Sequence, residues 1–522
     1  MAVVHPHGEA LTVTFVVPVP GHSGTSWLPL IASLERQTSE SWTAVFVHEL
    51  PADTVPADDG KVTHLAAGAG ARLADALQLG LAAVQGDFVA FLNSASRLAP
   101  EATALLIAEA ASGADVAYGN ESIGAWSFFK PEFSAERLRC QPYLGDTTIF
   151  KRSLVQHVGG IRADVDGAEL YDLVLKATGA ASKVAHVAEV VSARPPMSIA
   201  NAWGIASDVQ EASTTAVLRD HLRATGGGEV TAVGADGVHR TQRAVKGEPL
   251  VSIVIPTRGD HAVVHGSDRC LVVEAVRSVV ERSTYKNLEV VVVLDTPAPE
   301  ELSVQLRDVG GEALSIVVWD KPFSFSGKIN LGVLHSAGEY VLLLNDDVEV
   351  ISPSWIEPML ALAQLPHAGI VGPMLYFEDD TIQHAGHAYI RLDVTHIGLH
   401  SPRGAAGPWG AFLVEREVAG VTAACALVRR DLFLSVGGLS PLLPGNFNDV
   451  DFCMKLSTAG YQAYWTPNAE LYHFESKSRD PSVSKYEMRT AWGRWEHLFW
   501  SSPWWPTDPH ELFELGPGQR VQ

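Results

Sequence analysis

The sequence is poor in cysteine and in basic residues, and it contains no long uninterrupted apolar run. Its four cysteines, Cys140, Cys270, Cys425 and Cys453, lie far apart and show neither CxxC spacing nor a dense disulfide pattern. No stretch reaches the roughly 18–20 apolar residues needed to cross a bilayer. The first ten residues lack the basic-then-apolar order of a secretory signal. These absences favour a protein of the reducing cytoplasm.

The charge balance is strongly acidic. Lys and Arg number 38 against 60 Asp and Glu, which gives a formal net charge of −22. This excess argues against nucleic acid as a partner and against electrostatic adhesion to anionic lipid. With 47 % apolar and 19 % charged residues, the composition is typical of a well-packed globular protein. A chain of 522 residues is too long for one ordinary core, so two or three domains are expected.

Strands alternate with helices along the chain, which predicts an α/β fold with mostly parallel, Rossmann-like sheets. Two β-branched runs stop at proline in the same way, VTFVVP at 13–18 and VSIVIP at 251–256. Between them, residues 224–247 are rich in glycine and small polar residues. This segment is predicted to be a linker that carries a short strand or two.

The two halves also repeat one another beyond their opening strands. LERQT at 34–38 resembles VERST at 280–284, and GDFVAFLN at 86–93 matches GEYVLLLN at 338–345. In a third match, FKR at 150–152 is followed by VGG at 158–160, and VRR at 428–430 is followed by VGG at 436–438. Three matches in the same order predict two copies of one fold, at 1–223 and 248–490. An aromatic-rich tail, 491–522, follows them.

The second copy has a clear expected layout. Strands are predicted at 251–255, 288–294, 314–319 and 340–344, with helices at 272–282, 300–308, from 325, and 354–364. Ser352 and Pro353 stand where the N-cap and the first residue of the last helix belong.

The acidic segment NDDVEV at 345–350 is the strongest chemical signal. An apolar strand delivers adjacent carboxylates at its carboxyl end, where open α/β sheets bind ligands. Hard divalent cations such as Mg²⁺ and Mn²⁺ prefer oxygen ligands, so the segment indicates a metal site. A polar turn after a buried strand would have the same composition.

Two further segments carry candidate polar residues. In FNDVDFCMKL, Asp449 and Asp451 fall in the first turn of an expected helix, where the helix dipole favours carboxylates whatever their function. One of them could instead be a general base that takes the proton of a hydroxyl nucleophile. His473, in LYHFES, follows a strand-like stretch and could complete a metal shell, although a lone histidine also suits a core or surface position.

The order of these segments resembles the family 2 glycosyltransferases. VSIVIPTR, the LD after the second strand, FSFSGKIN, GEYVLLLNDDVEV, VTAACALVRR, VGGL, FNDVDFCMKL and YHFES occur in the family's order over about residues 249–500. The similarity is greatest to bacterial members that build rhamnose- or galactose-containing surface polysaccharides. It is specific for the fold and the reaction class, and much less so for the sugar.

The resemblance implies a donor site made by distant parts of the second copy. Asp295 would read the pyrimidine base, and Asp346 would contact the ribose or the metal shell. Ala423, Ala424 and Cys425 would flank the sugar. The other residues expected beside the nucleotide and its diphosphate are Pro256, Thr257, Arg258, Lys328 and Asn330.

The resemblance also implies the catalytic groups. Asp347 would be the direct ligand of Mn²⁺ or Mg²⁺, with His473 as a further ligand and Asp449 as the catalytic base. Asp451 then becomes a residue of the helix start or a support behind the site. Glu349, in the same acidic segment as Asp347, is a secondary candidate.

The implied activity is a metal-dependent, inverting transfer of a sugar from a nucleoside-diphosphate sugar, dTDP-rhamnose or a UDP-hexose. The acceptor would be a hydroxyl of a glycan or of a polyprenyl-linked glycan, which requires at most peripheral association with a membrane. A homo-oligomer is compatible with the sequence. Two alternatives remain open: a non-catalytic carbohydrate-binding or scaffold protein, and a nucleotidyltransferase, although PTRGDHAVVHG lacks the Gly-rich basic signature that the latter needs.

The first copy lacks the proposed chemical groups at the aligned positions. A diphosphate without a metal would leave its negative charges uncompensated there, so this copy is predicted to be inactive. Glu49 aligns with Asp295, so weak nucleotide binding by this copy remains an alternative. The remaining alignment places Ser94 and Ala95 opposite Asp346 and Asp347, Leu170 opposite Asp449, Ser192 opposite His473, and Ala76 and Gln78 opposite Lys328 and Asn330.

Two segments outside these motifs give weaker signals. The insertion at 259–269 contains His261, His265 and Asp268, which suit a polar loop better than a metal cluster. In the tail, Arg494-Trp495 resembles the QxxRW motif of processive synthases, but alanine occupies the glutamine position, so processive synthesis with extrusion is not expected. Trp492, Trp495 and Phe499 have helical spacing, which predicts that one face packs against protein.

Overall fold

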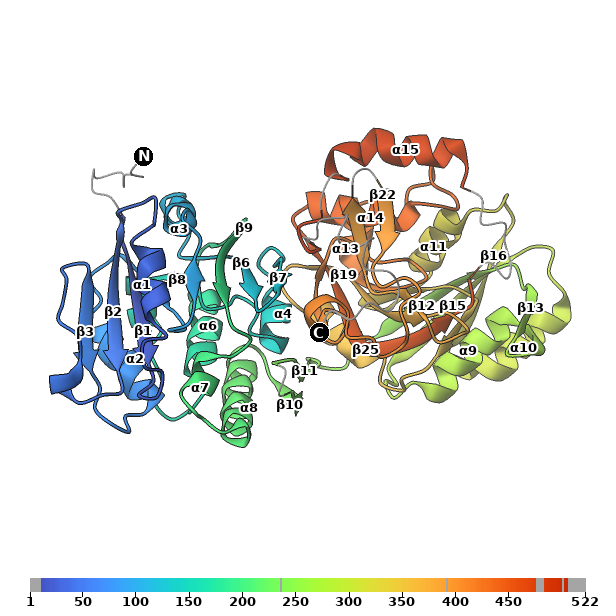
Figure 1. Ribbon diagram of the computed structural model, residues 1–522. Helices are drawn as coiled ribbons and strands as arrows, with labels where there is room; N and C mark the ends of the chain where they lie inside the picture. Colours follow the sequence, from blue (N-terminus) through green and yellow to red (C-terminus); the bar gives the residue numbers. More distant parts are fainter. Residues whose placement is uncertain (1–10, 235–236, 391–392, 476–482, 500–501, 506–522) are drawn as a thin grey trace. The chain divides into compact units, whose positions relative to one another are not determined.

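The computed structural model describes residues 11–234, 237–390, 393–475, 483–499 and 502–505. The chain divides into two compact units, Met1–Thr241 and Gln242–Gln522 (Figure 1). Ser476 of the YHFES segment and Trp500 of the tail lie outside the described residues. Among the described residues, none of the helices combines the length and the apolar character needed to traverse a bilayer.

The first unit is built on one mixed sheet. Its strands lie in the order β3 (Val62–Ala66), β2 (Trp42–His48), β1 (Val13–Val19), β4 (Phe88–Phe91), β8 (Ile149–Lys151), β6 (Val116–Ile123), β9 (Val184–Arg194) and β5 (Arg97–Leu98), with β7 (Trp126–Phe128) beside β6. Its helices are α1 (Leu28–Leu34), α2 (Leu73–Ala82), α3 (Ala102–Ala111), α4 (Ala135–Cys140), α5 (Arg152–His157), α6 (Glu169–Ala180), α7 (Ile199–Ala202) and α8 (Ser207–Ala224).

The second unit has a sheet of the same kind. Its strands lie in the order β16 (Leu314–Trp319), β15 (Leu288–Asp295), β12 (Val251–Thr257), β17 (Tyr340–Leu344), β24 (Cys425–Arg429), β19 (Ala368–Tyr376), β25 (Gln462–His473) and β18 (Val348–Val350), with β20 (Ile382–His384) beside β19 and β23 (Arg416–Val418) beside β25. Its helices are α9 (Leu271–Arg282), α10 (Glu300–Gly310), α11 (Phe325–Leu334), α12 (Ile356–Ala363), α13 (Arg430–Ser435), α14 (Asn448–Thr458) and α15 (Lys485–Trp495).

The two sheets have one topology. In each, four neighbouring strands are parallel. The sheet then continues through antiparallel pairs and one parallel pair, β6–β9 in the first unit and β19–β25 in the second. Both units also place a glycine directly against a hydroxyl of the first strand of the sheet. The amide of Gly86 donates to the Thr14 hydroxyl and that of Gly338 donates to the Ser252 hydroxyl, at 3.1 and 2.8 Å. A Cβ at either glycine would come within 3.0 Å of that hydroxyl oxygen, so the repeated glycines keep the strands together.

The boundary of the units lies within the glycine-rich segment, which is more structured than a plain linker. β10 (Gly228–Val233) and β11 (His239–Arg243) pair as a two-stranded sheet. His239 packs against Tyr171, and Arg139 bonds Thr241, so most of this hairpin belongs to the first unit.

The start of α12 corrects one expectation. The helix begins at Ile356, and its N-cap is Trp355 rather than Ser352. The Ser352 hydroxyl instead accepts the backbone amide of Glu470 at 3.1 Å, and the Pro353 carbonyl accepts the amide of Thr284 at 2.9 Å. Tertiary partners have therefore taken the groups that the local pattern assigned to capping.

The insertion at 259–269 forms a hairpin, β13 (His261–Val264) and β14 (Ser267–Cys270). His261 and Asp268 lie 3.3 Å apart on its exposed surface. His265 packs edge-on against Tyr472 and Phe474. The residues therefore sit as they would in an ordinary polar insertion.

Candidate active site

An open cleft with a volume of about 270 Å³ lies in the second unit at the carboxyl ends of β12 and β17. This is the edge at which open α/β sheets bind ligands. Ala423 and Ala424 lie in its wall, whereas Cys425 is buried in β24. The cleft is also lined by most of the residues named from the sequence: Pro256, Thr257, Arg258, Lys328, Asp346, Asp347, Asp449 and His473.

Strand pairing brings Asp347 and His473 together across 126 positions of sequence. The acidic turn follows β17 and leads into β18, which pairs with β25 so that Val348 lies opposite His473. The His473 Nε2 atom is 3.2 Å from the Asp347 Oδ1 atom. Both side chains are largely buried. A carboxylate and an imidazole nitrogen therefore converge on one point in the cleft.

The hydrogen bonds of His473 direct its Nε2 atom toward the acidic turn, where Asn345 bonds it. The Gln383 Oε1 atom lies 2.7 Å from Nδ1, so Nδ1 carries the proton and donates it. Asn345 Nδ2 then donates to Nε2 at 3.0 Å. An outer partner that fixes the tautomer in this way is usual for a metal-binding histidine.

Asp346 lies next to this pair, in surroundings that disfavour its ionised form. Burial and the charge of Asp347 raise its pKa to about 7, against the hydroxyl of Thr257, which donates to its Oδ2 atom at 2.6 Å. Two adjacent carboxylates repel one another when both are ionised, and a divalent cation between them offsets that repulsion. The donor set of the turn, oxygens with one imidazole nitrogen, fits Mn²⁺ or Mg²⁺.

Lys328 connects the nucleotide-side residues. Its side chain is buried, forms an ion pair with Asp295 and donates to the Thr257 carbonyl at 3.0 Å. Burial lowers the pKa of the Lys328 ammonium, while Asp295 opposes the shift. Asp295 is thus placed behind the cleft wall. Arg258 pairs with Asp260 at 2.8 Å.

Asp449 and Asp451 occupy the first turn of α14, as the sequence predicted, but they face different surroundings. The Asp449 carboxylate lines the cleft and accepts the amides of Val450 and Ala423, at 2.8 and 3.3 Å. Asp451 is fully buried; it accepts Trp495 Nε1 at 2.8 Å and pairs with Arg494 at 2.7 Å. Asp451 therefore holds α15 and supports the helix that presents Asp449.

Asn330 and Glu349 lie away from the cleft lining. The amide of Asn330 donates to the Leu439 carbonyl at 2.8 Å and accepts the Leu439 amide at 2.9 Å. Glu349 pairs with Arg282 at 2.7 Å and with Arg269 at 3.5 Å. In this structure both side chains tie elements of the fold together, which departs from the position that the resemblance implied for Asn330.

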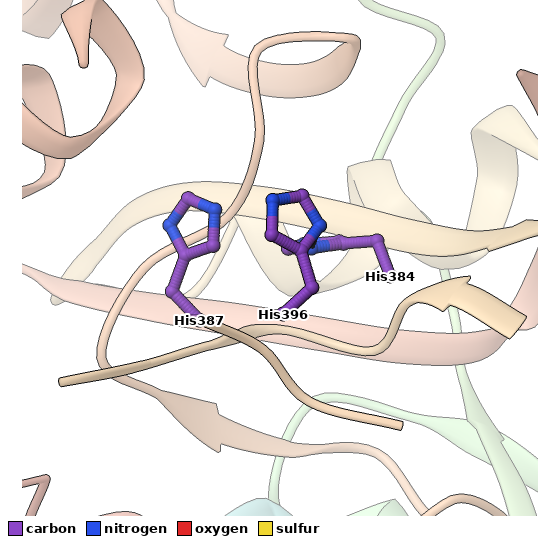
Figure 2. Close-up of side chains that lie close together, drawn as sticks. All are labelled: His384, His387 and His396. Carbon is purple, nitrogen blue, oxygen red and sulfur yellow. Dashed lines mark hydrogen bonds between the residues drawn. The ribbon is translucent and has the colours of Figure 1, made fainter. Parts of the chain in front are cut away.

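Sequence reasoning missed a group of three histidines. His384 ends β20, His387 begins β21 (His387–Ile390) and His396 ends β22 (Asp393–His396) (Figure 2). Burial lowers the pKa of all three, that of His387 to about 3. His387 and His396 also line the cleft. The signal was present as three histidines within thirteen residues, QHAGHAYIRLDVTH, but only the pairing of β21 with β22 brings the last to the first two.

The matching region of the first unit has different polar groups. The ungapped match of 86–98 with 338–350 makes Leu98 the counterpart of Val350, and these pair with Ser192 and Leu471. Two residues further along each strand, the counterpart of His473 is therefore Arg194. This corrects the alignment with Ser192.

Arg194 belongs to a buried ion-pair cluster. It lies 3.1 Å from Glu121 and 3.9 Å from Asp146, and Lys130 lies 3.4 Å from Glu121. Burial raises the pKa of Asp146 to about 6 against the attraction of Arg194. Asp146 also accepts a hydrogen bond from the backbone of Asn93, which follows β4, the strand that matches β17. Protein cations thus fill the space at that sheet edge.

Residues 252–437 match the family model described as glycosyl transferase family 2. The match lies wholly within the second unit, which is therefore similar to family 2 glycosyltransferases over these residues. The matched range includes the parallel strands and the acidic turn, whereas Asp449 and His473 follow it in the chain.

Curated relatives extend the similarity across both units. An uncharacterized protein, y4gI, of Sinorhizobium fredii is 31 % identical over 493 residues, 90 % of this chain and 53 % of its own. The O-antigen biosynthesis protein RfbC of Myxococcus xanthus is 29 % identical over 90 % of this chain and 38 % of its own. An N-acetylglucosaminyl-diphospho-decaprenol L-rhamnosyltransferase of Mycobacterium tuberculosis is 29 % identical over 28 % of this chain and 50 % of its own. The chain spans about half or less of the length of these relatives.

Glycosyltransferases are among the similar solved structures. GalNAc-T7 with UDP, GalNAc and Mn²⁺ has a TM-score of 0.38 at 15 % identity, over 48 % of either chain. The mannosyltransferase PcManGT of Pyrobaculum calidifontis with GDP-Man and Mn²⁺ has a TM-score of 0.33 at 15 % identity, over 48 % of this chain and 71 % of its own. At these scores the likeness decides nothing about the site.

Proposed function

We propose that the second unit transfers a sugar from a nucleoside-diphosphate sugar to a hydroxyl of a glycan acceptor, with inversion and with the help of Mn²⁺ or Mg²⁺. The observation that carries the proposal is the convergence of Asp347 and His473, 3.2 Å apart, in the cleft that Asp449 also lines. Three parts of the chain with no local reason to meet supply a metal-binding pair and a base.

Asp347 and His473 would hold the cation, with Asp346 beside them. When bound, a divalent cation stabilises the negative charge of a departing diphosphate. Gln383 keeps the His473 ring in the tautomer that has its acceptor nitrogen at Nε2, and a cation there would take the place of the Asn345 hydrogen bond. The buried ammonium of Lys328 keeps Asp295 and the Thr257 carbonyl in place on the nucleotide side.

Asp449 would take the proton of the acceptor hydroxyl. A sugar hydroxyl is a weak nucleophile at neutral pH, and a positioned carboxylate raises the rate of its attack by typically about 10²–10⁴-fold. The backbone amides of Val450 and Ala423 orient this carboxylate from the helix start. A single in-line displacement at the anomeric carbon then inverts its configuration.

We propose that the first unit is a non-catalytic copy of the same fold. Ser94 and Ala95 replace the adjacent aspartates, and Arg194 stands at the strand position of His473. A guanidinium that is already paired with Glu121 and Asp146 cannot act as a metal ligand. The unit would serve to position an acceptor, to associate with another copy, or to cover a surface of the catalytic unit.

The relatives suggest the substrates. The names of two of them refer to O-antigen biosynthesis and to rhamnosyl transfer onto a decaprenyl-diphosphate carrier. We propose dTDP-rhamnose or a UDP-hexose as donor and a glycan or polyprenyl-linked glycan as acceptor in cell-surface polysaccharide synthesis. Such a reaction suits a cytoplasmic protein acting at the inner face of the membrane.

The test is Mn²⁺-dependent release of nucleoside diphosphate from a panel of donors in the presence of glycan and polyprenyl-linked acceptors. The wild type is expected to turn over one donor, and Asp449→Asn to lose about 10²–10⁴-fold in kcat. Equal turnover by Asp449→Asn would overturn the base assignment. Binding of glycan without release from any donor would favour a carbohydrate-binding or scaffold protein.

A further inference from the structure

Three histidines of the second unit, His384, His387 and His396, lie close together in the fold. One ring nitrogen from each of His384, His387 and His396 falls within 4.8 Å of the other two. The rings meet edge-on, with centroids 4.8 to 5.0 Å apart, and they come from three different strands (Figure 2). From this geometry we infer that His384, His387 and His396 form a second metal site, for a borderline ion such as Zn²⁺.

The backbone holds the three ligands in place. His387 and His396 are directly opposite one another in the β21–β22 ladder, so their side chains leave the same face of the hairpin. His384 approaches from β20, beyond Gly386, whose φ of +100° turns the chain between the two strands. A Cβ at Gly386 would also come within 2.7 Å of Val418, so this turn requires glycine.

The separation of two of the three nitrogens suits tetrahedral coordination, and the His387 nitrogen lies within 4.8 Å of both. His384 Nδ1 and His396 Nδ1 lie 3.1 Å apart. Two imidazoles on one tetrahedral zinc, each at about 2.0 Å, hold their nitrogens about 3.3 Å apart. In the metal-free protein one of these atoms donates its proton to the other. Since His384 Nε2 accepts the amide of Thr422 at 3.3 Å, metal ligation through Nδ1 would move that ring proton to Nε2 and release this long contact.

Two further features distinguish the group from packed core histidines. The Nδ1 atom of His387 is buried and has no hydrogen-bond partner among the described residues, a costly arrangement unless a ligand completes it. The backbone of Gln383 bonds the His396 ring, the kind of outer contact that orients a metal-binding imidazole. The charged and titratable groups that act on the three rings are Asp449, Glu475, Arg416 and His473.

The ligand chemistry separates this site from the acidic turn. Three neutral nitrogens select Zn²⁺ and similar borderline ions, whereas carboxylate oxygens suit Mg²⁺ and Mn²⁺. Since His387 and His396 line the cleft, an ion held by the three nitrogens would be accessible from it. The site uses none of the proposed donor-site ligands, so it stands or falls independently of the proposed transferase activity.

The test is Zn²⁺ binding by the full chain after chelation, measured by competition with a chromophoric chelator in excess Mg²⁺. The wild type is expected to bind one Zn²⁺ per chain. His387→Gln and His396→Gln should each weaken binding by at least about 100-fold, while Asp347→Asn and the exposed control His335→Gln should leave it unchanged. Unaltered binding in both histidine variants, or no binding by the wild type, would overturn the site.

A replacement ligand guards against loss of folding. His387→Cys keeps a metal ligand at the same position, so the Co²⁺ form of that variant should gain a thiolate-to-metal charge-transfer band that the wild type lacks. Co²⁺ bound by the variant without this band would place the ion elsewhere and contradict the assignment. Loss of Zn²⁺ in Asp347→Asn but not in His387→Gln would do the same, because the ion would then belong to the acidic turn.

Discussion

The two units share one strand order but differ in which polar residues they keep. Some pairs are present in both. Asp172 and Lys176 lie 2.6 Å apart on α6, and the equivalent Asp451 and Lys455 lie 3.6 Å apart on α14. Since the first unit keeps this pair without the adjacent aspartates, the pair serves the fold rather than the chemistry.

A second retained contact joins a helix to the turn after the Gly-Gly pair. Gln78 donates to the carbonyl of Ile161 at 3.0 Å, and Asn330 donates to the carbonyl of Leu439 at 2.8 Å. The two amides hold equivalent positions. Asn330 is therefore explained by the fold, although the family resemblance placed it at the nucleotide.

The replaced residues form the opposite class. Asp346, Asp347 and His473 of the second unit become Ser94, Ala95 and Arg194 in the first. The buried strands around them are unchanged in order. Comparing the units thus separates residues that a fold needs from those that only a reaction needs.

The largest expected effect is loss of the candidate metal ligand. Asp347→Asn should lower Mn²⁺-dependent release of nucleoside diphosphate by about 10³-fold, because the ion contributes several kcal/mol of charge stabilisation. Glu349→Gln is the matched control, two residues along the same segment but paired with arginines, and should change the rate less than about twofold. An Asp347→Asn protein with more than a tenth of wild-type activity would contradict the distinction.

Breaking the buried cluster of the first unit should cost stability and leave the chemistry intact. Lys130→Met removes one of the two cations of the cluster and leaves only Arg194 to offset the Glu121 and Asp146 carboxylates, so the unfolding free energy of that unit should fall by about 3–5 kcal/mol in urea. Lys151→Met removes an exposed pair with Asp115 and should cost no more than about 1 kcal/mol. Equal effects of the two variants, or a matching loss of turnover by folded Lys130→Met, would contradict this account.

The pH dependence of metal binding should follow Asp346. Its folded pKa of about 7 exceeds the ordinary value of 3.8, so the metal-free fold loses stability from this group as pH rises between the two values. Cation binding needs the anion, so Mn²⁺ affinity should rise by about tenfold per pH unit up to about pH 7 and then level. Titrations of Asp346→Asn should rise less steeply over that range; a flat wild-type curve would refute the assignment.

The smallest effects are expected at the shared amide contact. Asn330→Ala and Gln78→Ala should each lower the stability of their own unit by about 1 kcal/mol. The KM for the donor should be unchanged in both. A tenfold rise in KM for Asn330→Ala with normal stability would instead return Asn330 to the nucleotide site.

Much of the fold could be predicted because local pattern decides it. The apolar runs that became β12, β15, β16 and β17, and the duplication of their order, were visible in the sequence. The predicted N-cap of α12 was wrong because the Ser352 hydroxyl accepts the amide of Glu470, a residue distant in sequence. The counterpart of His473 was displaced by two residues because β9 and β25 carry different register shifts against β6 and β19, and a bulge leaves no clear signal in a single sequence.

The site could be predicted where a motif supplied neighbouring residues, as at Asp346 and Asp347. Its cooperating residues depend on contacts between distant strands. Gln383 fixes the His473 tautomer from 90 positions away, and the β21–β22 pairing assembles the histidine cluster. Such contacts follow from register and side-chain direction, which local sequence does not determine.

The most direct test is the stoichiometry of nucleoside-diphosphate binding to the full chain in Mn²⁺, by calorimetry. The account predicts one site per chain, abolished by Asp347→Asn combined with His473→Gln and unaffected by Asp146→Asn in the first unit. Two sites per chain, or one site that survives the double substitution, would contradict the claim that only the second copy has kept its chemistry.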